Sequence, residues 1–457
     1  MSNKLSGSYK EIISITIPLI LGNVSHTAIA LSDIIIMGHH DTKNDTDLAA
    51  IGYVSLFFLV IIIAGSSFTK GAQILIAKHN GRGNYHKVGQ ITDHTLVFLG
   101  LIGIVLATLL YFSFKPFFFF LVHDPDLTRQ GDLFMHYRAP GIVINFIAQT
   151  FVAYFAGTHR TKILGLALSV MAIANIFLNI LLVYGKWGFP EMGIAGSGLA
   201  STIAEAISIL VLFAGIAIDK QRKHFQYLRF QRFNLEQMKE IFVIGLPLVG
   251  QALIGFISWI AFFTFIARMG QTPLATSNLL KAIYQLISIP AWSLANAANT
   301  MIGNLHGQQK VEEIIPVMKR ITLLSFLSSL IFIIPLAFFP HTALYLLSGR
   351  PEMATDAITP LYILLLAMLL FSLAIIPFNV IVSLGSTLIS LGIEIISIFF
   401  YLLYASFVFL ILEPTLTLAW LSELFYWVFI GSLSAWYLFK FNWKQRLDQI
   451  IPAEEND

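Results

Sequence analysis

One carboxylate and two amides stand out in this sequence because each lies within a long apolar stretch. Asp33 lies near the end of the apolar run 12–38, which is long enough to cross about 30 Å of hydrocarbon as a helix. Inserting a carboxylate near the centre of such a helix costs about 3 kcal/mol, and such residues generally face the protein interior and mark the path of an ion or substrate. The alternative is a carboxylate at headgroup level that a basic residue neutralises, but no Lys or Arg lies within one or two helical turns of Asp33.

Asn175 and Asn179 are the candidate partners of Asp33. They are four residues apart, so they lie on one face of a helix. Together with Asp33 they offer oxygen ligands for a hard cation such as Na⁺, or hydrogen-bond partners for a carboxyl group that binds and releases a proton. Buried asparagines can instead hold helices together, at roughly 0.6 kcal/mol for each hydrogen bond. The spacing alone does not separate an ion site from a structural contact.

Other polar residues within apolar runs could line a substrate cavity. These are His26, Thr202, Glu205, Lys281, Glu394 and Glu423. His26 precedes Asp33 by two helical turns on the same face, so it is a candidate proton relay, with a packing role as the alternative. Lys281, Glu394 and Glu423 could bind charged substrate, or they could pair with one another.

Composition restricts the class of protein. Of the 457 residues, 57% are apolar and 12% are charged, against about 25% charged residues in soluble domains, so the chain is an integral membrane protein. Its formal charge of +3 gives no indication of nucleic-acid binding, and the lack of cysteine excludes disulfides, Cys-ligated zinc and iron–sulfur clusters. Phosphate-binding loops, zinc-protease motifs and nucleophile elbows are also absent. We therefore expect neither an enzyme nor a cofactor other than a coupling ion.

Twelve apolar runs predict an all-α integral membrane protein with twelve transmembrane helices. They span residues 11–39, 48–77, 91–113, 131–157, 162–184, 194–218, 237–268, 275–305, 315–338, 356–385, 387–412 and 416–441. The most polar internal segment separates six spans from six. It predicts an N-terminal lobe over 1–218, a cytoplasmic connector over 219–236 and a C-terminal lobe with a short tail over 237–457.

The distribution of basic residues predicts the orientation. Nineteen Lys and Arg lie in the terminal segments and alternate loops, and seven lie in the opposite loops and helix ends. Because cytoplasmic loops carry the excess of basic residues, both termini should be cytoplasmic. We expect a multi-pass monomer in the inner membrane that contacts lipids and small amphiphilic molecules.

The two halves repeat each other at an offset near 226 residues. Ile17-Pro18-Leu19 recurs as Leu246-Pro247-Leu248, and the turn Gly81–Asn84 recurs in position as Gly307–Lys310. Chance similarity between apolar segments is the alternative, but the repeated turns are polar. Six-helix halves repeated in the same orientation are typical of transporters. Asp33 projects onto Phe262 or Phe265, so we expect ion chemistry to be confined to the N-terminal half.

These residues resemble the multidrug and toxic compound extrusion (MATE) family. The resemblance rests on Pro18, Asp33 and Gly38, on Leu48-Ala49-Ala50-Ile51-Gly52, on Gly81-Arg82-Gly83-Asn84, on Asn175 and Asn179, and on Gly193-Ile194-Ala195-Gly196-Ser197-Gly198. Their order and spacing match the family over nearly the whole chain. The resemblance implies a secondary active antiporter that exports amphiphilic, often cationic drugs in exchange for protons or Na⁺.

The resemblance also implies where the ion binds. In one branch of the family the residues matching Asp33, Asn175 and Asn179 form a cation site, whereas another branch has acidic residues in the seventh and tenth helices. Here the seventh helix has no acidic residue after Pro247, and the tenth offers only Asn379, a further cavity candidate. The resemblance therefore favours the N-terminal site. The alternatives are a lipid-linked oligosaccharide flippase, which should show more basic residues in its cavity, and a membrane-embedded enzyme or receptor.

Overall fold

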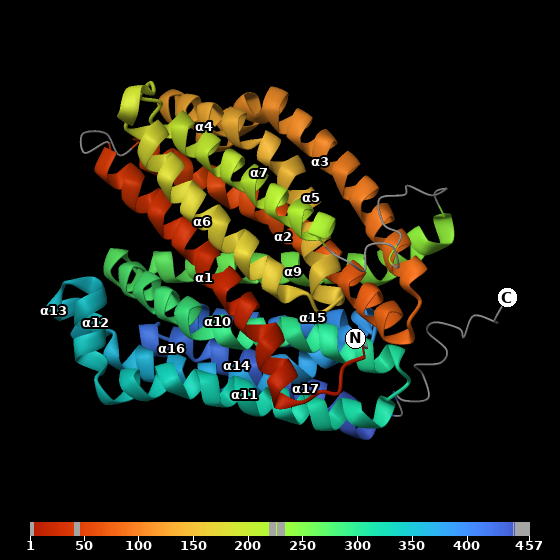
Figure 1. Cartoon of the computed structure of the whole chain (residues 1–457). Coiled ribbons are helices and arrows are strands. Elements are labelled where there is room, and N and C mark those ends of the chain that lie inside the picture. The colour runs from red at the N-terminus through yellow and green to blue at the C-terminus, as the bar shows by residue number, and fades with distance from the viewer. Residues whose placement is uncertain (1–3, 41–45, 219–224, 226–233, 442, 444–457) are drawn as a thin grey trace. The chain divides into compact units, whose positions relative to one another are not determined.

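The computed structural model describes residues 4–40, 46–218, 225, 234–441 and 443, and all of its described secondary structure is helical (Figure 1). The first half contains α1 (Tyr9–His40), α2 (Thr46–Arg82), α3 (Tyr85–Val122), α4 (Pro125–Arg138), α5 (Pro140–Gly157), α6 (Thr161–Val183), the 3-10 helix η1 (Lys186–Gly188) and α7 (Ile194–Ile218). The second half contains α9 (Leu235–Arg268), α10 (Gln271–Gly307), α11 (Val311–Phe338), α12 (Pro340–Ser348), α13 (Pro351–Asp356), α14 (Ile358–Ser383), α15 (Thr387–Ile411), α16 (Leu416–Trp420) and α17 (Ser422–Lys440). The predicted all-α membrane fold is therefore confirmed.

Within the described ranges, eleven helices are long and apolar enough to cross a membrane. The expected run 275–305 is the exception. It forms α10, which has 37 residues but carries Asn296, Asn299 and Asn304 in its second half and is less apolar than the others. α10 still packs as a core helix, because α11 and α14 lie against it.

Three of the expected spans are interrupted. The run 131–157 divides into α4 and α5, the run 356–385 begins at the end of α13, and the run 416–441 divides into α16 and α17. Pro140 explains the first division, because a proline has no N–H to donate to the preceding turn and its ring disfavours a continuous helix. The apolar pattern continues across Pro140, so hydropathy alone does not reveal the break.

The described chain forms two compact units. Ile17–Val249 form the first, called here the N-terminal unit, and Gly250 onward forms the C-terminal unit together with the start of the chain up to Thr16. Both α1 and α9 therefore contribute to both units, close to Pro18 and Pro247. The expected lobes instead divide at a connector over 219–236, most of which lies outside the described residues.

The start of the chain is held by α10 and α11 inside the C-terminal unit. The amide of Leu5 donates to Asn304 Oδ1 at 3.2 Å, and Gln308 Nε2 donates to the Leu5 carbonyl at 3.0 Å. Arg320 of α11 donates to the Gly7 carbonyl at 2.9 Å. Gly7 has a φ of +72°, and a Cβ on it would lie 2.1 Å from Val317, so a larger residue does not fit this docked conformation.

The backbone repeats where the sequence does. Gly83 and Gln309 both have positive φ, and so do His159 and Gly385. Each pair is about 226 residues apart, and each stands in the turn between two helices of its unit. The repeat therefore relates α2 and α3 to α10 and α11, and α5 and α6 to α14 and α15.

Candidate functional site

A chain of hydrogen bonds joins α1, α6 and α7 around Asp33. Asn179 Nδ2 donates to Asp33 Oδ1 at 2.7 Å and to Asn175 Oδ1 at 3.2 Å. Asn175 Nδ2 in turn donates to Ser201 Oγ at 3.0 Å. The three residues expected to form an ion site therefore lie together, and Ser201 extends their network.

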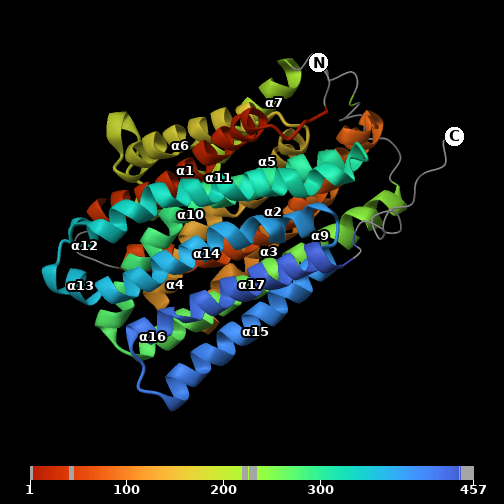
Figure 2. The same ribbon diagram turned by 90° about the horizontal axis from the view of Figure 1, so that it is seen from below.

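Close helix approach brings these side chains together. A Cβ on Gly165 of α6 would lie 3.1 Å from Pro18 of α1, and a Cβ on Gly196 of α7 would lie 2.7 Å from the backbone of Leu182 in α6. Small residues at such crossings let backbones approach and side-chain amides bond across helices. Figure 1 and Figure 2 both show α1 beside α6.

Asn175 and Asn179 are more deeply buried than Asp33. Asn175 and Asn179 are 1% and 0% exposed, whereas Asp33 is half-buried. Asn179 uses its amide nitrogen for both bonds, and its Oδ1 is buried without a partner. A buried acceptor without a donor is costly, so this oxygen is available either to a cation or to a protonated carboxyl group after the amide turns. The oxygen atoms of Asp33, Asn175 and Asn179 suit Na⁺ as well as a proton, and Asp33 supplies the one carboxylate among these three residues.

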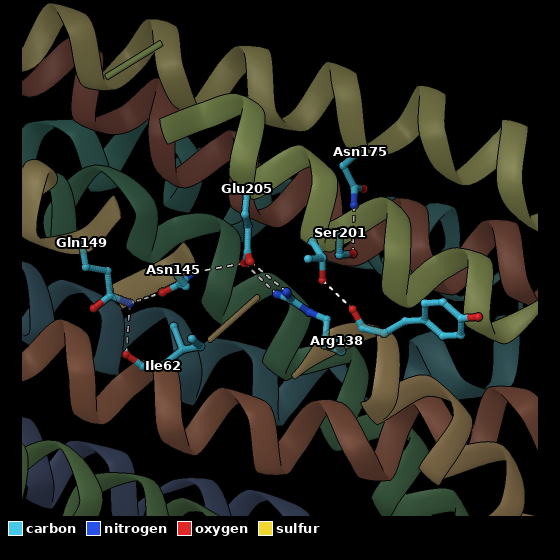
Figure 3. A network of polar contacts seen from close by, with 9 residues as sticks. Ile62, Arg138, Asn145, Gln149, Asn175, Ser201 and Glu205 are labelled. Atoms are coloured by element: carbon cyan, nitrogen blue, oxygen red, sulfur yellow. Dashed lines mark hydrogen bonds and ion pairs between the residues drawn. The ribbon is translucent and has the colours of Figure 1, made fainter. Parts of the chain in front are cut away.

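An ion pair lies further along α7. Arg138 Nη1 and Nη2 donate to Glu205 Oε2 and Oε1 at 2.8 and 2.7 Å, and their side chains are 11% and 10% exposed (Figure 3). Asn145 Nδ2 donates to Glu205 Oε1 at 3.1 Å, and Gln149 Nε2 donates to Asn145 Oδ1. Glu205, predicted as a cavity residue, is therefore held by an arginine and an asparagine.

The break between α4 and α5 positions this pair. Arg138 is the last residue of α4, and its guanidinium lies 3.7 Å from the centre of the Phe58 ring. A Cβ on Gly141 would lie 2.3 Å from Arg138 Nη1 and 2.9 Å from Glu205 Oε2. Thr202 Oγ1 donates to the carbonyl of Tyr137 at 2.8 Å, which fixes α7 to the same break.

Arg138 also lies close enough to Asp33 for its charge to act on the carboxylate. No basic residue is near Asp33 along α1, but the fold supplies one from α4. In the sequence, Arg138 is one of the seven basic residues counted in the opposite loops and helix ends, and that count gives no indication of a role at Asp33. Two features of the sequence could have identified Arg138. It lies inside an apolar run, and it directly precedes the dipeptide Ala139-Pro140.

The other predicted cavity residues do not gather at this site. His26 has an exposed side chain on α1. Lys281 of α10 lies over the Phe263 ring at 5.2 Å, and the ion pairs found among the described residues do not join it to Glu394 or Glu423. Asn379 donates to the Ile375 carbonyl at 2.9 Å and accepts from Asn299 at 3.4 Å, so it belongs to a hydrogen-bonded contact between α10 and α14.

Glu394 and Glu423 are both buried in the C-terminal unit. Glu394 accepts a hydrogen bond from the Tyr426 hydroxyl at 2.7 Å. Glu423 lies among Trp259, Tyr401 and Trp427. Of the two alternatives for Lys281 and the glutamates, pairing with one another is not found among the described residues. Sequence reasoning also missed the aromatic groups, because aromatic residues are frequent along the whole chain.

Comparison with known proteins places this arrangement in a family. The family model MatE matches residues 18–184 and 247–407, which together make up more than half of the chain. The chain belongs to the MatE family. The match covers Asp33, Asn175 and Asn179, and it starts in each half at the repeated proline.

Curated MatE-type relatives are similar over most of their length. The probable multidrug resistance protein YoeA of Bacillus subtilis is 27% identical over 369 residues, which cover 78% of this chain and 77% of YoeA. The probable multidrug resistance protein NorM of Thermotoga maritima is 22% identical over 356 residues, covering 78% of this chain and 75% of NorM. MatE proteins are membrane transporters, so this chain is a transporter and not an enzyme.

Solved MatE structures share the fold. An outward-facing multidrug resistance MATE family transporter of the MOP superfamily superposes with a TM-score of 0.85 at 18% identity, covering 97% of each chain. A MATE transporter in the straight conformation superposes with a TM-score of 0.86 at 18% identity, covering 96% of each chain. The expected two-lobe, twelve-helix layout is thus the layout of these MatE transporters.

Proposed function

We propose that this transporter is an antiporter that exports amphiphilic, often cationic compounds in exchange for protons or Na⁺, with the ion bound at Asp33, Asn175 and Asn179. The observation that carries the proposal is the 2.7 Å hydrogen bond from Asn179 to Asp33, at the end of a buried chain of polar side chains. An ionisable residue in such a place is a functional site by default. The names of the multidrug resistance relatives support the substrate class.

The amide of Asn179 supplies the change of state that coupling needs. An ion gradient can drive motion only if the ion interacts differently with two conformations. With Asp33 ionised, Asn179 Nδ2 donates to the carboxylate as observed. When a proton or Na⁺ occupies Asp33, the favourable group beside it is an oxygen, and turning the amide brings Asn179 Oδ1 toward Asp33. That turn also breaks the bond to Asn175 and thereby alters the contact with Ser201 on α7.

Arg138 stabilises the ion-free state, in which Asp33 is ionised. An ionised carboxylate inside a membrane protein needs a nearby positive charge or donors. Arg138 supplies the charge, while its bond to Glu205 keeps it from closing onto Asp33 as a permanent ion pair. The site can then release its ion without leaving an isolated charge.

We also propose a membrane location and an orientation for the protein. We place it in the inner membrane as a monomer surrounded by lipid, with both termini cytoplasmic. The bias of nineteen basic residues against seven supports this orientation.

Ion flux in proteoliposomes tests the proposal. Purified protein is reconstituted with a fluorescent cationic dye inside, and a proton gradient and a sodium gradient are imposed separately. We expect one of the two gradients to drive dye movement against its own concentration gradient, and Asp33→Asn to abolish that movement. Dye movement that neither gradient alters, or that Asp33→Asn retains, would overturn the proposal.

A further inference from the structure

Two carboxyl groups in the C-terminal unit have no role in the proposed coupling at Asp33. Glu394 of α15 is 4% exposed and Glu423 of α17 is 2% exposed. The ion pairs found within the described ranges include neither of them. A buried charge without a partner of opposite sign is strongly unfavourable, so each group needs a ligand that removes or balances its charge.

Glu394 faces α9, α10 and α17. The Tyr426 hydroxyl donates to Glu394 Oε1 at 2.7 Å. On α9, a Cβ at Gly255 would lie 3.4 Å from the same oxygen, so the backbone of α9 lies close by. Tyr284 of α10 is within electrostatic range of both glutamates, which places the two carboxyl groups in one cluster.

Glu423 lies among three aromatic side chains with polar groups, two of which are buried without a partner at hydrogen-bond distance. Trp259 of α9, Tyr401 of α15 and Trp427 of α17 turn their polar groups toward its carboxylate. The Tyr401 hydroxyl and the Trp427 indole nitrogen are buried and have no partner at hydrogen-bond distance. Such atoms are uncommon in folded proteins and point to a site whose occupancy changes.

Within the part of the chain that the structure describes, the surroundings of the cluster hold tyrosines and tryptophans but no basic group that acts on either glutamate. α14 packs against α17 and contributes the Phe371 ring, 4.6 Å from Trp427. Lys281 is one turn before Tyr284 on α10, but its ammonium group lies at the Phe263 ring. The titratable groups facing the two glutamates are therefore Tyr284, Tyr401 and Tyr426.

The internal repeat relates this cluster to the Asp33 site. His159 and Gly385 mark equivalent turns before α6 and α15, and the same spacing places Tyr401 at the position of Asn175. Asn175 contacts Ser201 on α7, and Tyr401 faces Glu423 on α17. The second half thus retains a polar contact between corresponding helices, with its carboxylate on a different helix from the first half.

We propose that Glu394 and Glu423 form a second proton-binding site, located in the C-terminal unit. Because both carboxyl groups are deeply buried, only a small ligand can reach them. A proton is the smallest, and it neutralises a carboxylate without further oxygen ligands. Tyr426 orients Glu394, while Tyr401 and Trp427 are the donors that stabilise Glu423 when its proton leaves. The site does not use Asp33, so it goes beyond the proposed function.

Infrared difference spectroscopy tests this site directly. Protein in lipid nanodiscs is taken from acidic to alkaline pH in sodium-free buffer, and the carbonyl stretch of protonated carboxyl groups is recorded in H₂O and D₂O. We expect Glu394→Gln and Glu423→Gln each to remove one band, and the double variant to remove both. Tyr426→Phe should shift the Glu394 band, because it removes the hydrogen bond but leaves the carboxyl group in place.

Controls separate the outcomes. Glu413→Gln, at an exposed position, and Asp33→Asn should leave both bands unchanged. Bands that survive in the double Gln variant would overturn the proposal, and so would their loss on adding NaCl at constant pH, which would assign the pair to sodium. If the double variant is not monodisperse, the single variants and Tyr426→Phe decide. Transport lost in Asp33→Asn with both bands intact supports the two sites independently, and each can fail without the other.

Discussion

The Asn179 amide reaches the Asp33 carboxylate at 2.7 Å across 146 residues of sequence. This bond joins the first helix of the chain to α6 and ties both to α7 through Asn175 and Ser201. A change in the charge of Asp33 on α1 therefore affects hydrogen bonds on α6 and α7 as well. Substitutions at these positions should therefore alter the dependence of transport on ions.

Asp33→Asn should abolish export while leaving folded protein in the membrane. Asparagine has nearly the same shape and can still accept from Asn179, but it has no negative charge to attract Na⁺ and no carboxyl group to bind and release a proton. Cells expressing the variant should show the drug sensitivity of cells without the transporter, at an unchanged protein level on immunoblots. Asp126→Asn, at an exposed position in the first turn of α4, is the matched control. Full resistance with Asp33→Asn would contradict the prediction.

Asn179→Ala should change the ion dependence of transport more than it changes substrate binding. Asn179→Ala removes an oxygen ligand from the ion-bound state, and an interaction with a charged group is worth about 1.5–3 kcal/mol, so the half-maximal ion concentration should change by about 10-fold or more. If Na⁺ is the coupling ion, that concentration should rise in both Asn179→Ala and Asn175→Ala. The measurement is dye transport against Na⁺ concentration and pH. If both variants are less stable but keep the wild-type ion dependence, the asparagines only join helices.

Arg138 and Glu205 should depend on each other for stability. Removing one partner of a buried ion pair leaves an uncompensated charge and costs about 3–5 kcal/mol. Arg138→Ala and Glu205→Ala should each lower the thermal unfolding midpoint in detergent, and the double variant should lower it less than the sum of the two. Arg129→Ala, at an exposed position on α4, should have little effect. Additive losses in the double variant would show that the pair is not coupled.

Gly71→Ala should destabilise the N-terminal unit. A Cβ at Gly71 of α2 would lie 2.7 Å from the Cα of Gly245 in α9, and the backbone there cannot move aside as a side chain can. Overpacking of this kind costs about 1–3 kcal/mol. Gly100→Ala on α3 is the control, because a Cβ there meets nothing within 4 Å. The check is the unfolding midpoint of each variant, and equal midpoints would contradict the prediction.

The connector and η1 should lie on opposite sides of the membrane. The chain has no cysteine, so a single introduced cysteine reports its own side. A membrane-impermeant maleimide applied to intact cells should label Trp187→Cys, where the native side chain is 78% exposed, and should label Phe230→Cys only after permeabilisation. Labelling of Phe230→Cys in intact cells would reverse the predicted orientation.

Spacing predicted that Asn175 and Asn179 share one helical face, and the structure places both beside Asp33. Four residues between Asn175 and Asn179 fix them on one helical face, and a carboxylate in an apolar run must face inward. The helix spans followed from the same rules, apart from the three interrupted runs, of which the division between α4 and α5 at Pro140 is one. The lower hydropathy of α10 reflects its buried asparagines and did not hide the helix.

Contacts between helices were the part that local rules could not supply. Glu205 and Arg138 are 67 residues apart, and their pairing depends on the break at Pro140 and on the lack of a side chain at Gly141. For Lys281 and Glu394, the sequence left open whether they bind charged substrate or pair with one another. The fold instead places an aromatic ring beside the lysine and a tyrosine hydroxyl beside the glutamate. Only the tertiary arrangement decides between such partners.

The docking of Leu5 onto Asn304 sets the order in which the protein can be completed. The two residues are separated by 299 positions, and at about 5–20 residues per second the ribosome needs on the order of 15–60 s to make the intervening chain. During that interval Leu5 lacks its native partner on α10, although the rest of α1 can already pack against α6. The contact between Leu5 and α10 therefore cannot form until α10 has been synthesised, and no early helix pair can replace it.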